Sequence, residues 1–299
     1  MKYTGVIPAF YACYDSEGNV SKDRTKALAE YLMGKGVNGL YVCGSSGECI
    51  YQNVEERKMI LESVMEVCKG KITIIAHIAA PSTRDSIALA KHAESLGVDA
   101  IAAIPPIYFR LPESSIYKYW TDMVEATNLD FIIYNIPQTT GYNLSVSLFE
   151  RMIAHPRVIG VKNSSMPVLD IEQFKAHGGK DCVIFNGPDE QFVAGRLMGA
   201  DAGIGGTYGV MPELFIKANE YLEKSDVKTA REIQVAINDI IMSMCSVKGN
   251  LYAVIKGIIR LNGLDIGSVR APLEEVERLE QDKVKAIWEK INTAIAKFC

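Results

Sequence analysis

A lysine at the end of an apolar run is the residue of this sequence best suited to covalent chemistry. Lys162 follows Val158–Val161, and an ammonium group directed into an apolar interior is costly to bury. Burial favours the neutral amine because it lowers the pKa of lysine from about 10.4. A neutral amine can attack a ketone and form a Schiff base. The alternative is a lysine that reaches solvent or pairs with a carboxylate, and the residue alone does not separate the two.

A tyrosine ends the preceding apolar run. Tyr134 lies in Phe131–Asn135, and if the two runs are neighbouring strands, its phenol can approach the Lys162 amine. A phenol polarised by a nearby lysine can transfer protons. The alternative is a core aromatic whose hydroxyl finds a partner, but the pairing with Lys162 favours proton transfer.

Small residues follow an earlier run. In Gly44–Gly47, of sequence Gly-Ser-Ser-Gly, backbone N–H groups and the hydroxyls of Ser45 and Ser46 could converge on a carboxylate. Turns of this composition are also common without function. The segment does not match the G-x-S-x-G nucleophile elbow, which disfavours a serine hydrolase.

Metal and nucleotide chemistry lack sequence support. The four histidines, His77, His92, His155 and His177, form no pair at the spacing of zinc ligands. The segment Gly203–Tyr208 has a tyrosine where a dinucleotide-binding loop needs its third glycine. We therefore expect no metal and no cofactor.

Strands and helices must bring these side chains together, and strand and helix patterns alternate regularly along the chain. Helical patterns recur at Lys22–Lys35, Val54–Cys68, Thr83–Leu96, Glu113–Thr127, Val146–His155 and Glu190–Met198. They alternate with eight short apolar runs: Val6–Phe10, Gly39–Cys43, Ile72–His77, Ala100–Ile104, Phe131–Asn135, Val158–Asn163, Cys182–Asn186 and Ala202–Gly206. Eight such units predict an α/β fold, a (β/α)₈ TIM barrel, over the alternative of a doubly wound sheet. Catalytic side chains then belong at the carboxyl ends of the strands.

The strand signal stops at Tyr208. Helical patterns follow at Pro212–Leu222, Asp226–Val247, Leu251–Leu261 and Pro272–Phe298. We predict a barrel over residues 1–208 and a C-terminal helical extension over 209–299, packed on the barrel because no linker separates them.

Composition restricts the partners. The 299 residues carry 32 basic and 36 acidic side chains, a net charge of −4, so the chain lacks the basic surface that nucleic acid requires. No apolar stretch is long enough to span a membrane, and no signal sequence begins the chain. The seven cysteines are scattered without a paired motif. We expect a cytoplasmic protein with reduced thiols and a small-molecule substrate.

Three motifs together resemble the pyruvate-dependent class I aldolase family, which includes N-acetylneuraminate lyase and dihydrodipicolinate synthase. They are Gly44–Glu48, Tyr134–Pro137 and Gly160–Lys162, and the resemblance covers essentially the whole chain. It implies a (β/α)₈ barrel with a helical extension, assembled as a homotetramer, that acts on a keto acid without a metal.

The resemblance also implies residue roles. Lys162 would carry the imine, and Tyr134 would relay the proton when the carbon–carbon bond breaks or forms. Ser45 would link that relay to Tyr134, and Ser46 with its N–H would hold the pyruvyl carboxylate. Tyr108 would extend the relay, in part across a subunit interface.

Substrate recognition separates the branches of this family. The synthase carries an arginine where this chain has Thr139, whereas Phe185–Gln191 is similar to the lyase segment whose acidic pair contacts the sugar tail. Gly206 departs from the lyase pattern, which has a serine there. The substrate-binding residues implied are Ser45, Ser46, Ser164, Gly187, Asp189, Glu190 and Gly206.

We therefore expect cleavage of N-acetylneuraminate, or of a related 2-keto-3-deoxy sugar acid, to pyruvate and an aldehyde sugar. The missing serine at Gly206 leaves both substrates open. One alternative is the synthase reaction, condensation of pyruvate with aspartate semialdehyde. A second is a non-catalytic binding protein on the same barrel.

Overall fold

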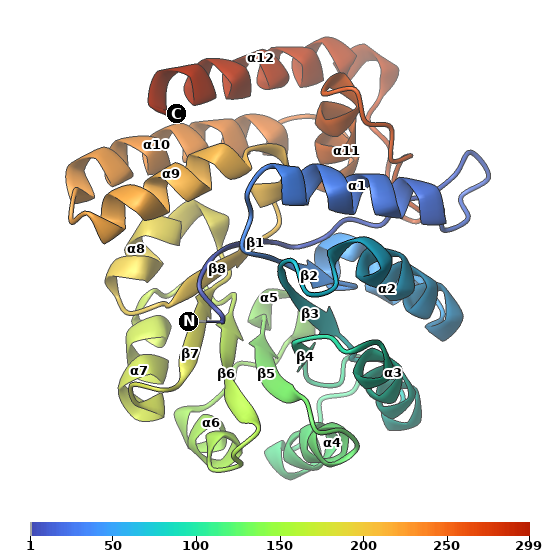
Figure 1. Ribbon diagram of the computed structural model, residues 1–299, viewed down its shortest axis with the longest axis vertical. Helices are drawn as coiled ribbons and strands as arrows, with labels where there is room; N and C mark the ends of the chain where they lie inside the picture. The colour runs from blue at the N-terminus through green and yellow to red at the C-terminus, as the bar shows by residue number, and fades with distance from the viewer. Residues whose placement is uncertain (1) are drawn as a thin grey trace.

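The computed structural model describes residues 2–299, and eight parallel strands within them form one barrel (Figure 1). Neighbours pair in the order β1-β8-β7-β6-β5-β4-β3-β2. Between β1 and β2, the Phe10 N–H donates to the Tyr41 carbonyl at 2.9 Å and closes the ring. The strands are β1 Gly5–Pro8, β2 Gly39–Val42, β3 Thr73–His77, β4 Ala100–Ala103, β5 Asp130–Asn135, β6 Val158–Asn163, β7 Val183–Asn186 and β8 Ala202–Gly205. This arrangement confirms the predicted TIM barrel and excludes the doubly wound sheet.

Helices between the strands surround the barrel, except that the short α5 lies inside their ring in the view of Figure 1. They are α1 Lys22–Gly34, α2 Val54–Cys68, α3 Thr83–Leu96, α4 Glu113–Glu125, α5 Pro137–Thr140, α6 Val146–Ile153, α7 Leu169–Gly178 and α8 Phe192–Leu197. Short 3₁₀ turns occur at η1 Ser45–Gly47, η2 Cys49–Tyr51, η3 Asp189–Gln191, η4 Tyr208–Val210 and η5 Arg278–Glu280. Local signals set the ends: the Ser82 side chain accepts from the Asp85 N–H at the start of α3, and Gly97 ends it in the left-handed region.

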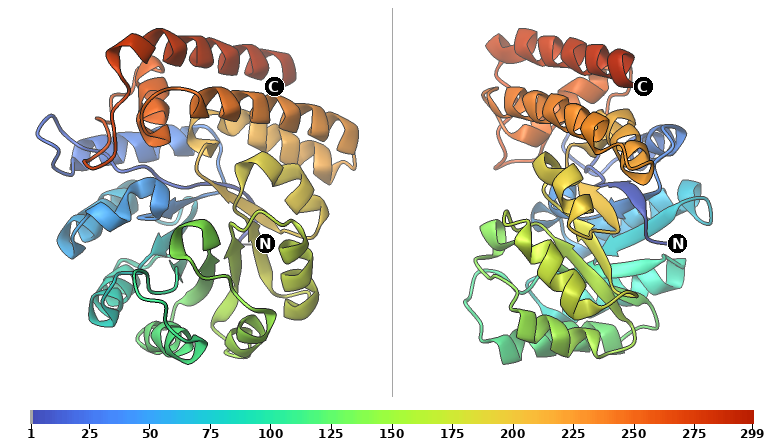
Figure 2. Two further views of the ribbon diagram at one scale, coloured as in Figure 1. Left: turned by 180° about the vertical axis from the view of Figure 1, so that it is seen from behind. Right: turned by 90° about the vertical axis from the view of Figure 1, so that its left-hand side faces the viewer.

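Four further helices stack beyond α1 and α8, and both views of Figure 2 show α10 and α12 side by side. They are α9 Pro212–Glu223, α10 Val227–Cys245, α11 Leu251–Leu261 and α12 Gln281–Phe298. None of the helices in residues 2–299 combines the length and apolar character needed to cross a bilayer.

The predicted helix over Pro272–Phe298 is wrong in its first part, because α12 begins at Gln281. The residues of that first part make contacts with the loop before α11 instead. The Glu274 carbonyl accepts from the Asn250 N–H at 2.9 Å, and the Glu280 carboxylate accepts from the Lys248 N–H at 3.4 Å. Such contacts replace the regular hydrogen bonds of a helix.

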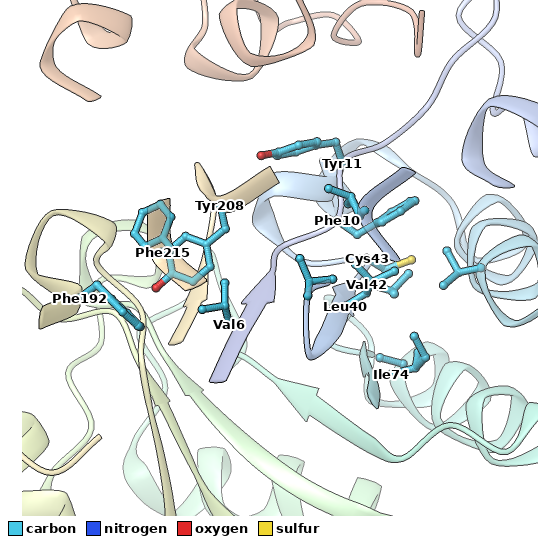
Figure 3. Packing of buried hydrophobic residues seen from close by; sticks show 14 of the residues in the cluster. Val6, Phe10, Tyr11, Leu40, Val42, Cys43, Ile74, Phe192, Tyr208 and Phe215 are labelled. Atoms are coloured by element: carbon cyan, nitrogen blue, oxygen red, sulfur yellow. The ribbon is translucent and has the colours of Figure 1, made fainter. Parts of the chain in front are cut away.

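The apolar core has two layers. Residues such as Phe192, Tyr208 and Phe215 pack between strands and helices, with the last two rings 3.9 Å apart (Figure 3). A smaller layer fills the barrel: Tyr3, Ile7, Ala9, Tyr41, Ile75, Ala100, Ala102, Ile132, Tyr134, Phe185, Ala202 and Ile204. Tyr134 thus points inward, and its neighbour in the ladder is Lys162. Register alone directs the lysine into the barrel, because paired residues on adjacent strands share a face.

Candidate active site

Lys162 is 4% exposed at the end of β6. Its Nζ lies 3.8 Å from the ring centre of Tyr134 and 4.5 Å from that of Tyr41. Burial lowers the pKa of Lys162 to about 7, and the attraction of the Asp189 carboxylate opposes this shift only in part. A large fraction of the amine is therefore neutral at neutral pH, which is the form that attacks a carbonyl.

Tyr134 is held on several sides. Its ring meets those of Tyr41 and His77 edge to face, with centroids 5.7 and 5.9 Å apart. Burial raises the pKa of Tyr134 to about 12, while hydrogen bonds with Ser45 and Ser164 oppose the rise. The structure thus brings together four predicted residues: Lys162, Tyr134, Ser45 and Ser164. The raised pKa keeps the phenol protonated until a reacting group exchanges a proton with it.

The turn after β2 is strained at both ends. Cys43 and Glu48 have φ of 60° and 55°, a region that non-glycine residues rarely adopt. The Cys43 carbonyl lies 2.9 Å from His77 Nδ1, and since a carbonyl only accepts, Nδ1 carries the proton. Ser45 begins η1, so its N–H and that of Ser46 have no acceptor within that helix.

A buried ion pair fixes the far end of this turn. Lys256 Nζ of α11 contacts Glu48 Oε1 at 2.7 Å, with both side chains at most 1% exposed. The second carboxylate oxygen accepts the Arg270 N–H, so the charge is well satisfied. Sequence reasoning missed Lys256 because 208 residues separate it from Glu48.

The acidic pair follows β7, and Asp189 contacts Thr207 after β8. Asp189 is 7% exposed, and one oxygen accepts from both the N–H and the hydroxyl of Thr207 at 2.6 Å. Burial raises the pKa of Asp189 to about 6, against these hydrogen bonds. Gln234 and Asn238 of α10 donate to the carbonyls of Asp189 and Glu190, each at 3.0 Å. The extension therefore holds the backbone of the predicted acidic pair.

Two glycines permit close approaches. A Cβ on Gly187 would lie 2.0 Å from Ser164 Oγ, so only glycine fits beside that serine. A Cβ on Gly206 would lie 3.1 Å from Ser46 Oγ. The same Ser46 hydroxyl donates to Tyr252 Oη at 3.1 Å, a contact from α11 that sequence reasoning also missed.

Within a single chain, the predicted catalytic residue Tyr108 lies outside the cluster around Lys162 and Tyr134. It is 93% exposed on the loop after β4, with φ of 80°, and its ring meets Phe109 edge to face at 5.0 Å. A strained backbone conformation persists only where surrounding contacts stabilise it, and an exposed tyrosine has few such contacts within its own chain.

No three His, Cys, Asp or Glu side chains within residues 2–299 gather as a metal site would require. What the site contains is a nucleophile, a proton-transfer group, hydroxyls and a buried carboxylate.

A closed (β/α)₈ barrel with a near-neutral lysine amine against a tyrosine defines an enzyme, a lysine-dependent class I aldolase that works on carbon–carbon bonds. The model of the dihydrodipicolinate synthetase family matches residues 2–291. The chain belongs to this family.

Its relatives favour one branch. The N-acetylneuraminate lyase of Mediterraneibacter gnavus is 56% identical over 299 residues, 99% of this chain and 95% of that protein. The N-acetylneuraminate lyase of Rhizobium meliloti is 31% identical over 281 residues, 94% and 92% of the two chains. The solved structure of a catalytic lysine mutant of the Ruminococcus gnavus sialic acid aldolase has a TM-score of 0.99, with 56% identity over 100% of this chain and 98% of that chain. These similarities confirm the family inferred from the sequence, leave the synthase alternative less supported, and exclude the non-catalytic alternative.

The lowered pKa of Lys162 predicts a pH dependence. The rate of imine formation with pyruvate should rise with pH as the amine deprotonates, reach half its maximum near pH 7, and level off above it. Borohydride trapping at short times over a pH series measures this rate. A rate that still rises about tenfold per pH unit at pH 9 would indicate a solvent-exposed lysine instead.

Proposed function

We propose that this enzyme cleaves N-acetylneuraminate, or a related 2-keto-3-deoxy sugar acid, to pyruvate and an aldehyde sugar. The observation that carries the proposal is the buried Lys162 amine against the Tyr134 phenol, at the end of the barrel where such sites lie. The names of the relatives support the substrate class, and the lysine in the name of the solved mutant supports the covalent mechanism.

The proposed reaction balances without a cofactor. The Lys162 amine adds to the C2 ketone and water leaves, which gives a protonated imine that accepts electrons. The C3–C4 bond then breaks: its electron pair enters the C2–C3 enamine, and the C4 hydroxyl proton passes to the Tyr134 oxygen while the phenol gives its own proton to the relay through Ser45. A proton from the same relay is delivered to C3, and hydrolysis releases pyruvate and restores the amine.

The remaining predicted residues bind substrate in this proposal. The backbone N–H groups of Ser45 and Ser46 hold the pyruvyl carboxylate, which fixes the ketone for attack, and the Ser45 hydroxyl links Tyr134 to the proton relay. Asp189 and Glu190 accept hydrogen bonds from the polyol tail, and Ser164 lies beside it. Polar groups that stay unpaired without a polyol reject substrates that lack one.

The proposal also includes the larger organisation. The barrel of residues 1–208 and the extension of 209–299 act as one functional unit, supported by the contacts of α10 and α11 with the site. We propose a cytoplasmic homotetramer in which Tyr108 completes the relay of a neighbouring subunit. The exposure of this tyrosine in a single chain supports that role.

Substrate preference tests the lyase assignment. We expect release of pyruvate from N-acetylneuraminate, and little product from pyruvate with aspartate semialdehyde, because Thr139 offers no cation for a second carboxylate. A coupled lactate dehydrogenase assay follows the cleavage, and a panel of 2-keto-3-deoxy sugar acids ranks the related substrates. Preference for aspartate semialdehyde would contradict the assignment.

A further inference from the structure

Tyr252 is a polar side chain that the C-terminal extension contributes to the wall of the site. Its hydroxyl accepts a hydrogen bond of 3.1 Å from Ser46 Oγ. The side chain is half-buried, and together with Ser45 it borders a cavity of about 550 Å³ that extends from the turn after β2 to the loop after β4. Because a phenol both accepts and donates, the Tyr252 proton stays available to a ligand after the oxygen has accepted from Ser46.

The space in front of this hydroxyl is kept open by a glycine. A Cβ on Gly206 would meet Ser46 Oγ at 3.1 Å and Tyr252 Oη at 3.7 Å, with one Tyr252 ring carbon the next nearest atom. The glycine itself is fixed, because Tyr11 Oη donates to its carbonyl at 2.6 Å. Figure 3 shows Tyr11 with its hydroxyl directed toward the end of β8. The Gly206 backbone, Ser46 and Tyr252 thus border a small volume that a side chain at position 206 would face.

The phenol is held in place by the ion pair one helical turn further along. Tyr252 and Lys256 are four residues apart on α11 and share a face. Their partners, Ser46 and Glu48, are two residues apart in the turn after β2. Helix α11 is therefore attached to this turn at two points, and Tyr252 meets a ligand without first losing conformational freedom.

We propose that Tyr252 is a substrate-binding residue whose hydroxyl donates to a hydroxyl or amide group on the carbon chain beyond the pyruvyl unit, in the volume left by Gly206. Ser46 holds the carboxylate beside it through its N–H, so the phenol reaches the next part of the same ligand. This inference rests on the proposed cleavage of a sugar acid. It gives the C-terminal extension a direct part in substrate selection.

Tyr252→Phe removes the hydroxyl and keeps the ring. We expect KM for N-acetylneuraminate to rise about tenfold and kcat to change less than about threefold, the effect of one lost hydrogen bond. Half-saturation by pyruvate in borohydride trapping should change less than about twofold, because pyruvate lacks the chain that Tyr252 contacts. Tyr31→Phe is the matched control: its hydroxyl accepts from Asn262, which follows α11, and it should retain the original KM for both ligands.

A hydroxyl at position 206 should partly restore the binding of N-acetylneuraminate to Tyr252→Phe. Adding Gly206→Ser to Tyr252→Phe is expected to lower KM for N-acetylneuraminate at least about threefold relative to Tyr252→Phe alone. Adding Gly206→Ala instead should not lower it. If Tyr252→Phe weakened the binding of pyruvate as much as that of the sugar acid, Tyr252 would act only through Ser46. An unchanged KM for N-acetylneuraminate would show that Tyr252 does not contact the substrate. Either result overturns the inference. Failure of the unaltered enzyme to trap pyruvate would instead overturn the proposed function.

Discussion

Lys162→Ala is expected to lower the cleavage rate by at least about ten-thousandfold, because no other route to the imine remains. The variant should also lose the mass increase that pyruvate and borohydride add to the unaltered enzyme. The fold should survive, since the substitution removes a buried amine and with it a desolvation cost. Intact mass spectrometry after trapping, together with a thermal melt, measures both expectations.

The control for this variant is Lys180→Ala, which alters an exposed lysine in the turn before β7. It should keep the rate and the mass increase. If Lys162→Ala still gained one reduced pyruvyl group, the imine would form on another amine, and the assignment of the nucleophile would be wrong.

Local patterns explain why the fold and the centre of the site could be predicted. The eight strands are short apolar runs, and their order along the chain is also their order around the barrel. Tyr134 and Lys162 end consecutive runs, so the register that pairs them follows from the barrel itself. The proximity of Tyr134 and Lys162 could therefore be predicted without knowing any long-range contact.

Long-range contacts explain what the sequence did not reveal. Tyr252 and Lys256 have the spacing of an ordinary helix face, and only the packing of α11 against the turn after β2 gives them their partners. A similar long-range contact, from the Asn250 N–H to the Glu274 carbonyl, lies in the first part of the predicted Pro272–Phe298 helix, which is not helical. A periodic pattern shows which residues share a face, but it does not show which distant segment that face meets.

Tyr134→Phe is expected to separate the two halves of the mechanism. The variant keeps the ring against which Lys162 Nζ lies at 3.8 Å, and the face of an aromatic ring stabilises a cation such as the protonated imine. Trapping of pyruvate should therefore survive. The kcat for cleavage should fall by at least about a hundredfold, the usual effect of losing an acid–base group.

The matched control is Tyr117→Phe, a tyrosine on α4 whose ring stacks on Arg151 outside the barrel and whose loss of a hydroxyl should leave kcat unchanged. Unchanged turnover in Tyr134→Phe would remove this phenol from the proton relay and leave Ser45 or Ser164 as the acceptor of the C4 proton. Loss of trapping would mean that the hydroxyl also takes part in forming the imine. The predicted split between trapping and turnover arises because burial keeps the phenol protonated, with a pKa of about 12, until the developing alkoxide and the imine act on it together.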